Sequence, residues 1–436
     1  MPPKHTQRSA PSGKALSRTL LAAVVPILAA AVASGFELRV TPPAEYDRYL
    51  AKSNVVLADG ARAIDAERGI QVLDKEFRPR AMIRLAGIRS FVAWRNTDLV
   101  VFTDTSVHIY DSSGKEKASF LRLKEPYPLL SRGDFVGFAE LASFREGTTR
   151  VSMLTEQCEV KSEFSVPGRF QMLDSARGLG VAWLALGHVP FAPELVSIWK
   201  DGAKVRDLAR PGVSQHLAVF PIAEGGPLYL WEFEKGDAPF LSAFDLEGTV
   251  LWRRDLSDSR IESPKAVASP AGDCLAIWGY TKGQTCGETG LWLLDRSGAV
   301  KARKEYRDIN EVSFDATGKH LLVAAAGELH SLSPLDGRAI WRRRYGGNSP
   351  IASRPPFAFG GSGRKPYLAF LCVDSPPDAA KGETGTSALE VRELATGRLL
   401  GRRNLEGTDS CRIEKLSDER LLLRGDSRSW IAEVAY

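Results

Sequence analysis

Residues that often carry chemistry are scarce in this chain of 436 residues. It has 5 cysteines and 6 histidines, and apart from His5 no histidine lies within four positions of another histidine or of a cysteine. This spacing argues against a zinc site, whose ligands cluster, and the odd, unpatterned cysteines argue against a disulfide framework. We therefore expect no metal and no cofactor. Cys274 and Cys372 lie inside apolar runs and are expected to be buried.

Catalytic motifs are missing as well. The chain has no G-x-S-x-G elbow and no acid pair that stands out. The glycine-rich segment 360–365 ends in Arg-Lys, but Pro366 and an apolar run follow it. A phosphate-binding loop needs Ser or Thr and a helix at that point, so we interpret the segment as a turn. The sequence thus supplies no catalytic residue, and we expect a binding protein more than an enzyme.

Acidic residues are absent from residues 1–36, which we interpret as a signal peptide or signal anchor. This leader carries four basic residues, an apolar run over residues 20–33, and Ala-Val-Ala at 31–33 before Ser34. Together these features resemble a cleaved secretory signal. If the leader is retained, residues 20–36 anchor the chain to a membrane instead. Either outcome places the body outside the cytoplasm, in the periplasm or secreted, and a retained N-terminal segment would give it membrane contact.

Beyond the leader the chain lacks an excess of charge of either sign. The net charge of +5 reflects 58 Lys and Arg against 53 Asp and Glu, and without the four basic residues of the leader the balance is 54 to 53. A nucleic-acid-binding surface needs clustered basic residues. We therefore expect no nucleic-acid partner and instead a protein partner in the cell envelope.

Long helical periodicity is also missing; only residues 42–52, within a linker at 37–54, suit a short helix. The rest is strand and tight turn, with turns rich in Asp and Gly as hairpins require. Eight hairpins recur, at residues 70–85, 107–121, 151–166, 196–208, 241–256, 291–306, 329–345 and 389–405. An apolar strand precedes each hairpin, and four-stranded units of about 45 residues are typical of β-propeller blades.

The predicted fold class is therefore all-β, a single β-propeller over residues 55–436. We favour eight four-stranded blades, with seven as the alternative. The C-terminal strands at 412–416, 421–423 and 430–434 are expected to join N-terminal strands from Val55 in one mixed closing blade.

Two hairpins carry a family resemblance. Asp245-x-x-Gly248-x-x-x-Trp252 and Asp336-Gly337-x-x-x-Trp341 resemble repeats of the quinoprotein-like propellers, whose blades dock through such a tryptophan. The turns around Gly272 and Gly318 are similar to those of WD40 and TolB-like blades. The resemblance implies a structural role for two tryptophans and four turn glycines: Trp252, Trp341, Gly248, Gly298, Gly337 and Gly397.

The sequence also departs from these families. Ala302 and Gly401 stand where the other two hairpins would carry tryptophan, and no Gly-His to Trp-Asp pattern occurs. The adjacent cysteine pair of the quinone-dependent dehydrogenases is absent too. The alternative to a binding scaffold is an enzyme with a site in the central channel, either such a dehydrogenase or a hydrolase.

Four insertions share one position in the repeat, between the second and third strands of a blade: residues 186–194, 232–239, 280–290 and 373–387. Loops at the same step of successive blades emerge on one face of a ring, and such loops often carry function. We predict a partner-binding face, although tolerated surface insertion is the alternative. The candidate contacts are Phe191, Phe233, Phe240, Lys282, Glu288 and Asp374.

Basic pairs recur at one register of the fourth strand, at 253–254, 303–304, 342–343 and 402–403. Charged residues on an exposed edge strand prevent edge-to-edge pairing. The alternative interpretation is a basic belt that meets anionic headgroups.

Overall fold

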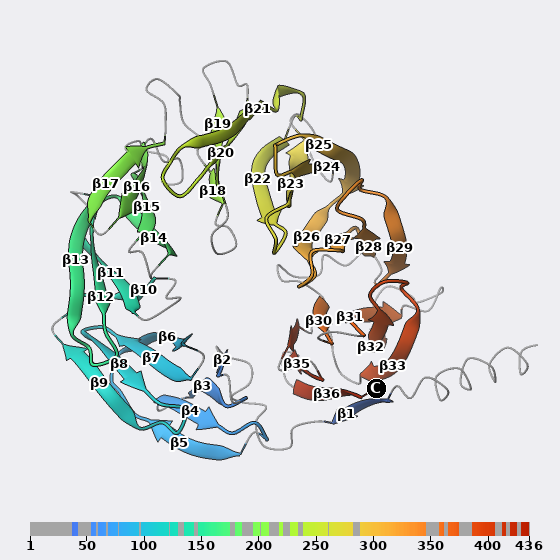
Figure 1. Ribbon diagram of the computed structural model, residues 1–436. Helices are drawn as coiled ribbons and strands as arrows, with labels where there is room; N and C mark the ends of the chain where they lie inside the picture. The colour runs from blue at the N-terminus through green and yellow to red at the C-terminus, as the bar shows by residue number, and fades with distance from the viewer. Residues whose placement is uncertain are drawn as a thin grey trace, which may run out of the picture.

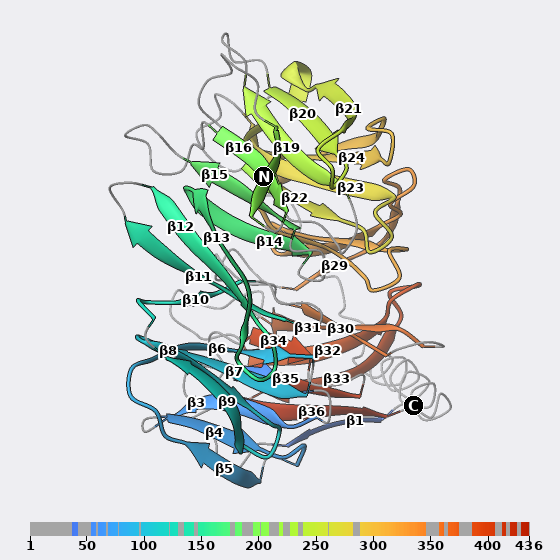
Figure 2. The ribbon, with the colours of Figure 1, turned by 60° about the vertical axis from the view of Figure 1, so that its left-hand side comes forward.

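The computed structural model describes residues 37–41, 54–57, 60–66, 69–76, 78–95, 97–121, 123–129, 135–143, 147–174, 179–184, 195–200, 202–208, 218–220, 227–233, 239–259, 261–281, 288–345, 357–361, 365–374, 386–405, 412–415, 419–424 and 429–435. These residues form four-stranded antiparallel sheets that follow one another around a ring in chain order (Figures 1 and 2). The predicted fold class, an all-β propeller of four-stranded blades, is confirmed. The helix expected at 42–52 lies outside the described residues.

Eight sheets are each built from four consecutive strands, and we number them along the chain. Sheets 1 to 4 comprise β2 Asn54–Val56, β3 Arg62–Ala66, β4 Gly69–Leu73 and β5 Pro79–Ile83; β6 Ile88–Trp94, β7 Asp98–Thr103, β8 Ser106–Tyr110 and β9 Glu116–Leu121; β10 Tyr127–Pro128, β11 Val136–Ser143, β12 Thr148–Leu154 and β13 Val160–Pro167; β14 Arg169–Asp174, β15 Leu179–Leu184, β16 Leu195–Lys200 and β17 Ala203–Asp207.

Sheets 5 to 8 comprise β18 Ala218–Phe220, β19 Leu228–Phe233, β20 Pro239–Phe244 and β21 Val250–Asp255; β22 Ile261–Ala268, β23 Cys274–Thr281, β24 Glu288–Asp295 and β25 Val300–Arg307; β26 Ile309–Phe314, β27 Leu321–Ala325, β28 Glu328–Leu332 and β29 Ala339–Arg344; β30 Phe357–Gly360, β31 Tyr367–Asp374, β32 Thr386–Glu393 and β33 Leu399–Leu405. A 3-10 turn, η1 Ser257–Ser259, joins sheets 5 and 6. Each of the eight hairpins predicted from the sequence forms the third and fourth strands of one sheet.

A further sheet closes the ring. It consists of β34 Arg412–Lys415, β35 Arg420–Arg424 and β36 Ser429–Ala435, with β1 Glu37–Thr41 paired to β36 as its outermost strand. The mixed closing sheet was expected, but not its N-terminal strand: the strands from Val55 belong to sheet 1, and β1 completes the closing sheet instead. Eight sheets thus consist of four consecutive strands each, which matches the predicted number of blades. With the closing sheet included, the described residues form nine four-stranded sheets.

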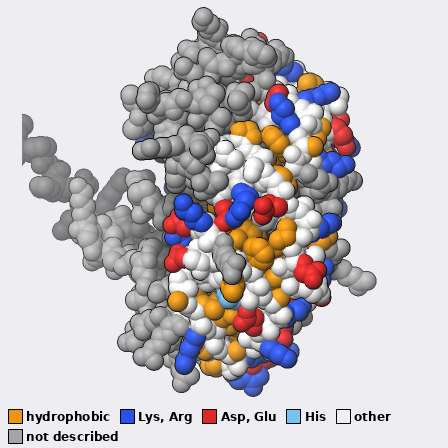
Figure 3. Space-filling view, turned by 90° about the vertical axis from the view of Figure 1, so that its left-hand side faces the viewer, with side chains coloured by type: hydrophobic (Ala, Val, Ile, Leu, Met, Phe, Trp, Pro, Cys, Tyr) orange, Lys and Arg blue, Asp and Glu red, His pale blue; other side chains and the backbone are white. Residues whose placement is uncertain are grey.

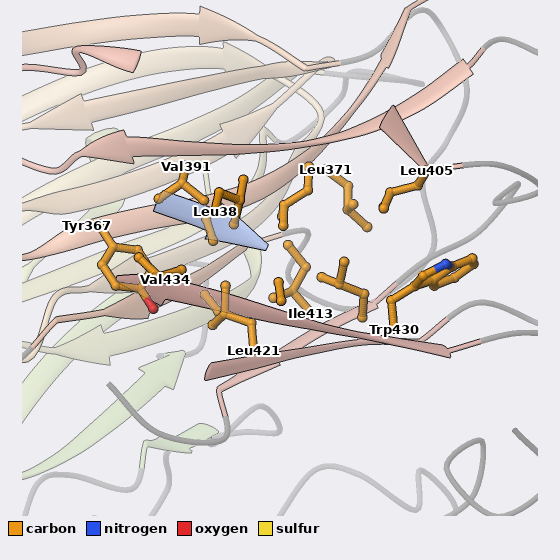
Figure 4. Packing of buried hydrophobic residues seen from close by; sticks show 14 of the residues in the cluster. Leu38, Tyr367, Leu371, Val391, Leu405, Ile413, Leu421, Trp430 and Val434 are labelled. Atoms are coloured by element: carbon orange, nitrogen blue, oxygen red, sulfur yellow. The ribbon is translucent and has the colours of Figure 1, made fainter. Parts of the chain in front are cut away.

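Burial follows the order of strands within each sheet. In sheet 2 every residue of β7 and β8 is buried, whereas β9 alternates between exposed and half-buried residues. The fourth strand thus forms the outer rim, as Figure 1 shows for β5, β9 and β13. Apolar side chains fill the space between neighbouring sheets, and Figure 4 shows this layer between sheet 8 and the closing sheet, where Leu38 from β1 packs with Tyr367 and Leu421. Since a four-stranded sheet alone leaves both apolar faces exposed, stacking around the ring stabilises the fold.

Candidate functional site

The strand order gives the ring two unlike faces. Connections between second and third strands and connections from one sheet to the next leave at the same end of the sheets; we call this end the loop face. Connections between first and second and between third and fourth strands leave at the other end, the turn face. All strands of a sheet pair antiparallel, so this assignment follows directly from the topology.

Backbone hydrogen bonds join the two kinds of connection on the loop face. In sheet 2 the amide of Asp104 donates to the Gly87 carbonyl at 3.0 Å, and the amide of Leu123 donates to the Thr105 carbonyl at 2.9 Å. Residues 104–105 link β7 to β8, while Gly87 and Leu123 lie in the connections before and after the sheet. The short second-to-third loop is therefore held between its two neighbours.

Sheet 7 repeats the arrangement. The amide of Ala326 donates to the Asp308 carbonyl at 3.3 Å, and the amide of Tyr345 donates to the Gly327 carbonyl at 2.9 Å. Asp308 and Ala326 both have positive φ, at 51° and 46°, a backbone conformation that residues other than glycine rarely adopt. In sheets 2 and 7, backbone hydrogen bonds therefore hold the short second-to-third connection of the loop face in place.

The four long insertions occupy this same step. They connect β15 to β16, β19 to β20, β23 to β24, and β31 to β32. Each joins the second to the third strand of its sheet, as the sequence predicted, and their positions place all four on the loop face. Most of their residues, including Phe191 and Lys282, lie outside the described residues.

The remaining predicted contacts lie at the strand ends beside the insertions. Phe233 ends β19 and Asp374 ends β31, although their side chains are outside the described part of the structure. Phe240 in β20 is half-buried, and the guanidinium carbon of Arg253 lies 4.0 Å from its ring centroid. Glu288 begins β24 and is exposed. All four therefore lie at the loop-face ends of their strands, and the described side chains of Phe240 and Glu288 belong to neighbouring sheets.

Sequence reasoning missed an exposed aromatic residue at the edge of the insertion 280–290. The Tyr280 side chain lies near the end of β23 and is 60% exposed. Glu288 and Arg307 are directly opposite each other on β24 and β25, and the Arg307 side chain is 83% exposed. Tyr280 is opposite Thr289, so its side chain lies on the other face of the sheet from Glu288 and Arg307. Tyrosine and arginine are residue types enriched at protein interfaces.

The turn face, by contrast, repeats one contact around the ring. Turn glycines with positive φ lie against the fourth strand of the preceding sheet: a Cβ on Gly298 would stand 2.6 Å from the Trp252 ring, and one on Gly397 would stand 2.7 Å from Trp341. The indole N–H of Trp252 donates to the Arg296 carbonyl at 2.9 Å, and that of Trp341 donates to the Leu394 carbonyl at 2.8 Å. Both tryptophans thus touch the next sheet.

The same position accepts other side chains. Gly337 lies on Ala302, and Gly248 lies on Arg206, whose guanidinium donates to the Gly248 carbonyl at 3.1 Å. In sheet 3, which lacks the glycine, Cys158 adopts a φ of 58° in its place and is buried. Burial raises the pKa of the Cys158 thiol to about 11, so it stays protonated at neutral pH.

The basic pairs of the outer rim bind neighbouring parts of the ring. The second member of three pairs reaches the following sheet: Arg254 donates to the Gly298 carbonyl at 3.1 Å, Arg343 to Glu390 at 2.9 Å, and Arg403 to the Leu38 carbonyl at 3.1 Å. On the side seen in Figure 3, basic, acidic and apolar side chains intermingle. These contacts add a role between sheets that neither sequence interpretation contained.

Glu390 is the most buried acid of this network. Its carboxylate, fully buried, also accepts hydrogen bonds from Arg392 at 2.8 Å and Arg402 at 3.1 Å. Burial alone would raise the pKa of Glu390, but hydrogen bonds from Arg343 and Arg392 outweigh it and hold the pKa below its usual range. A charged carboxylate therefore joins sheets 7 and 8.

A hydroxyl, imidazole and carboxylate relay in sheet 2 is a second arrangement that sequence reasoning missed. The Ser106 hydroxyl lies 2.8 Å from His108 Nε2, and His108 Nδ1 lies 3.0 Å from the Glu116 carboxylate. This order matches a hydrolase triad. However, Ser106 is only 5% exposed and its hydroxyl also contacts Thr103 at 2.5 Å. The geometry supports a polar link among strands β7, β8 and β9.

Within the described ranges, no group of three or more His, Cys, Asp or Glu residues is arranged to hold a metal ion. Cys274 and Cys372 are buried, as predicted. Cys286 lies outside the described ranges.

Comparison with known proteins gives the fold and no closer relationship. No family model matches the chain, and no curated protein matches it by sequence. A solved structure described as a eukaryotic initiation factor is similar, with a TM-score of 0.58 and 13% identity over 83% of this chain and 88% of that one. The shared feature is the propeller fold.

Two further similar structures have lower scores. BamB from Moraxella catarrhalis has a TM-score of 0.42 and 12% identity over 91% of this chain and 98% of its own. The WD40 domain of SCAP from fission yeast has a TM-score of 0.42 and 9% identity over 92% of this chain and 98% of its own. At such identities the likeness does not transfer a function.

Proposed function

We propose that this chain is an exported β-propeller scaffold that binds a protein partner in the cell envelope through its loop face. The observation that carries the proposal is the position of the four long insertions: each leaves the ring at the same step of its sheet. A rigid ring that presents variable loops on one side is a common arrangement for recognition.

The chemistry at the loop bases supports a protein partner. Tyr280 is exposed at one end of sheet 6, Glu288 and Arg307 lie at the same end on the other face of the sheet, and Phe240 with Arg253 lies at the base of the neighbouring insertion. Tyrosine and arginine are enriched at the energetic centres of protein interfaces. The nearly neutral body, with 53 acidic residues, does not favour a nucleic acid.

Export rests on the leader, with its basic start and apolar run at residues 20–33. The described residues include no helix long and apolar enough to cross a bilayer. Cell fractionation tests the proposal: the protein should be found in the envelope or the medium, and full-length protein in the cytoplasm would contradict export.

Partner binding is tested by paired substitutions on the two faces. Tyr280 and Leu335 are both exposed, at 60% and 81%, but Leu335 lies in a turn between β28 and β29 on the turn face. The partner would first be identified by affinity capture from the native envelope and then purified. We expect Tyr280→Ala to weaken its binding about tenfold or more, as loss of an interface anchor does, and Leu335→Ala to leave it unchanged.

Equal binding by the two variants would contradict the role of the loop face. Thermal unfolding serves as the control, since each substitution removes an exposed side chain and should change stability by less than about 0.5 kcal/mol.

A further inference from the structure

The junction between the outer strands of sheets 6 and 7 departs from the contacts of the rest of the rim. In sheets 5, 7 and 8 the second member of the basic pair donates to the following sheet, as Arg254, Arg343 and Arg403 do. Lys304 is the second member of the pair in sheet 6. In the part of the chain that the structure describes, its ammonium has no hydrogen-bond or ion-pair partner.

Sheet 7 presents basic side chains to Lys304 and no free acceptor. His330 on β28 and Arg342 on β29 are directly opposite each other, so both side chains lie on the same face of sheet 7. That face meets sheet 6, because the ring centroids of His330 and Tyr306 are 5.1 Å apart. Arg342 is exposed and forms no ion pair with any described carboxylate. We call Lys304, Tyr306, His330 and Arg342 the rim cluster; β25 and β29 are neighbours in Figure 1.

Electrostatics confirm that the cationic groups converge on the imidazole. Burial lowers the pKa of His330, the Glu328 carboxylate raises it, and the charges of Arg342 and Lys304 lower it further. A charge affects a neighbouring pKa noticeably only at short range. The histidine therefore lies between two cations that come from different sheets.

The acid closest to the rim cluster is already engaged. Glu328 Oε1 accepts a hydrogen bond from Arg344 Nε at 3.1 Å, and its Oε2 lies 3.4 Å from His330 Nε2. Arg344 is directly opposite Glu328 on the next strand. Glu328 thus balances Arg344, and the positive charges of Lys304 and Arg342 remain unbalanced.

Three exposed acids nearby have other positions or partners. Glu305 alternates with two members of the rim cluster along β25, so its side chain lies on the opposite face of the sheet. The Asp308 carboxylate is 3.9 Å from Arg307, and Asp336 accepts a hydrogen bond from the Arg338 amide at 3.1 Å. The rim cluster is therefore a local concentration of positive charge on a nearly neutral body.

The rim cluster lies on the same side of sheet 6 as Tyr280. Tyr280 is directly opposite Thr289, and Thr289 is directly opposite Tyr306. The three side chains therefore share one face, with Thr289 buried between the two tyrosines. Neighbouring strands are about 4.8 Å apart, so roughly 10 Å separates the backbones of Tyr280 and Tyr306. A short peptide segment spans that distance.

We propose that the rim cluster binds a carboxylate-rich segment of the protein partner between Lys304 and Arg342, next to the part of the partner that contacts Tyr280. The proposal deepens the proposed function and rests on it. Charge complementarity carries it, since two unbalanced cations favour a partner that supplies anions. Carboxylates accept strong charge-assisted hydrogen bonds from both ammonium and guanidinium groups.

The test uses the full chain and two capped peptides, acetylated hexaglutamate amide and hexaglutamine amide, in calorimetry at low salt. We expect hexaglutamate to bind and hexaglutamine not to bind. The double variant Lys304→Gln and Arg342→Gln should weaken hexaglutamate binding about tenfold, since two charge-assisted contacts are lost.

A matched control removes one exposed arginine and one exposed lysine from sheets 1 and 2. Arg84→Gln combined with Lys115→Gln should change hexaglutamate binding less than about twofold, because separated surface charges are screened. An equal fall in the two double variants would overturn the proposal, as would no binding of hexaglutamate by the parent.

The imidazole of His330 reports where the peptide binds. Its NMR signal is assigned with His330→Gln. Bound hexaglutamate should raise the pKa of His330, because a nearby anion favours the imidazolium. The substitutions at Lys304 and Arg342 should raise this pKa without peptide, and hexaglutamate should then add little. An unchanged pKa of His330 in the saturated parent would place the peptide elsewhere and overturn the proposal.

Vesicles test the lipid alternative for the same charges. Phosphatidylglycerol vesicles are compared with phosphatidylcholine vesicles in a flotation assay. Binding to the anionic vesicles that depends on Lys304 and Arg342, without binding of hexaglutamate, would assign the rim cluster to a lipid surface and overturn the proposal. We expect hexaglutamate binding without such vesicle binding.

These outcomes are distinct from those of the proposed function. Loss of partner binding in Tyr280→Ala without hexaglutamate binding refutes only the acidic segment. Hexaglutamate binding at the rim cluster, with no effect of Tyr280→Ala on the partner, refutes only the role of the loop face.

Discussion

The turn face and the loop face of this propeller follow opposite rules. On the turn face, short turns place a glycine, or Cys158, against the preceding sheet, and the contact recurs from sheet to sheet. On the loop face, equivalent connections range from the two residues 104–105 to the long insertion before β32. The difference indicates that the turn face contributes a repeated contact between sheets, whereas the connections of the loop face vary in length.

The largest expected effect is at Glu390, where two sheets share one buried carboxylate. Glu390→Gln keeps the shape but leaves Arg343, Arg392 and Arg402 without their anion. Removal of one partner from a buried ion pair costs about 3 to 5 kcal/mol. Urea unfolding measures the loss. Glu393→Gln is the control, since its half-exposed carboxylate pairs with Arg398 at the surface and contributes less than about 1 kcal/mol.

The pH dependence of the same variant supplies the check. The pKa of Glu390 is held below its ordinary value of 4.5, so its contribution is complete above that pH and is lost as the pH falls through the folded-state pKa. Stability of the parent should fall on acidification more steeply than that of Glu390→Gln. Parallel curves would show that Glu390 does not couple the sheets as described.

Alanine substitutions at two glycines distinguish the cost of backbone strain from the cost of a lost contact between sheets. Gly298 and Gly272 have φ of 79° and 67°, but a Cβ on Gly298 meets Trp252 whereas one on Gly272 meets nothing within 4 Å. Gly272→Ala should cost about 1 to 2 kcal/mol from left-handed geometry alone. Gly298→Ala should cost about 1 to 3 kcal/mol more, from the clash. Equal losses of stability in the two variants, measured by thermal unfolding, would show that the contact between Gly298 and Trp252 does not stabilise the docking of the sheets.

Substitution of Trp252 tests the same contact with Gly298 from the preceding sheet. The side chain is half-buried, so Trp252→Ala should cost about 2 kcal/mol, less than full burial would imply. Val250→Ala in the same strand removes a 55% exposed side chain and should change little. Unchanged stability of Trp252→Ala together with lost partner binding would reverse the assignment and make Trp252 a ligand contact.

The regular face was the more predictable from sequence. Turns such as 245–248 are recognisable because Asp245 accepts amide hydrogen bonds from Glu247 and Thr249, and because Gly248 supplies the positive φ. The destinations of Arg254 and Arg343 were not predictable, since each depends on the sheet that follows. Nor was β1, because a strand of five residues without a hairpin leaves no periodic pattern.

The loop face was predictable only in part. The register of the insertions follows from counting strands, but the exposed Tyr280 and the hydrogen bonds between loops arise from the three-dimensional packing of neighbouring sheets. The hydrogen-bonded series Ser106, His108 and Glu116 was not predictable either. His108 and Glu116 lie on adjacent strands but not directly opposite each other, and this pairing depends on the register of the hairpin.

The most direct test of the division between the two faces is binding of the purified partner to a protein in which residues 281–288 are replaced by a two-residue hairpin turn. Shortening residues 374–386 in the same way gives a second, independent variant. We predict that each loses partner binding by tenfold or more while its unfolding midpoint stays close to that of the parent, because the turn-face contacts are intact. Parental affinity in both shortened proteins would contradict the account.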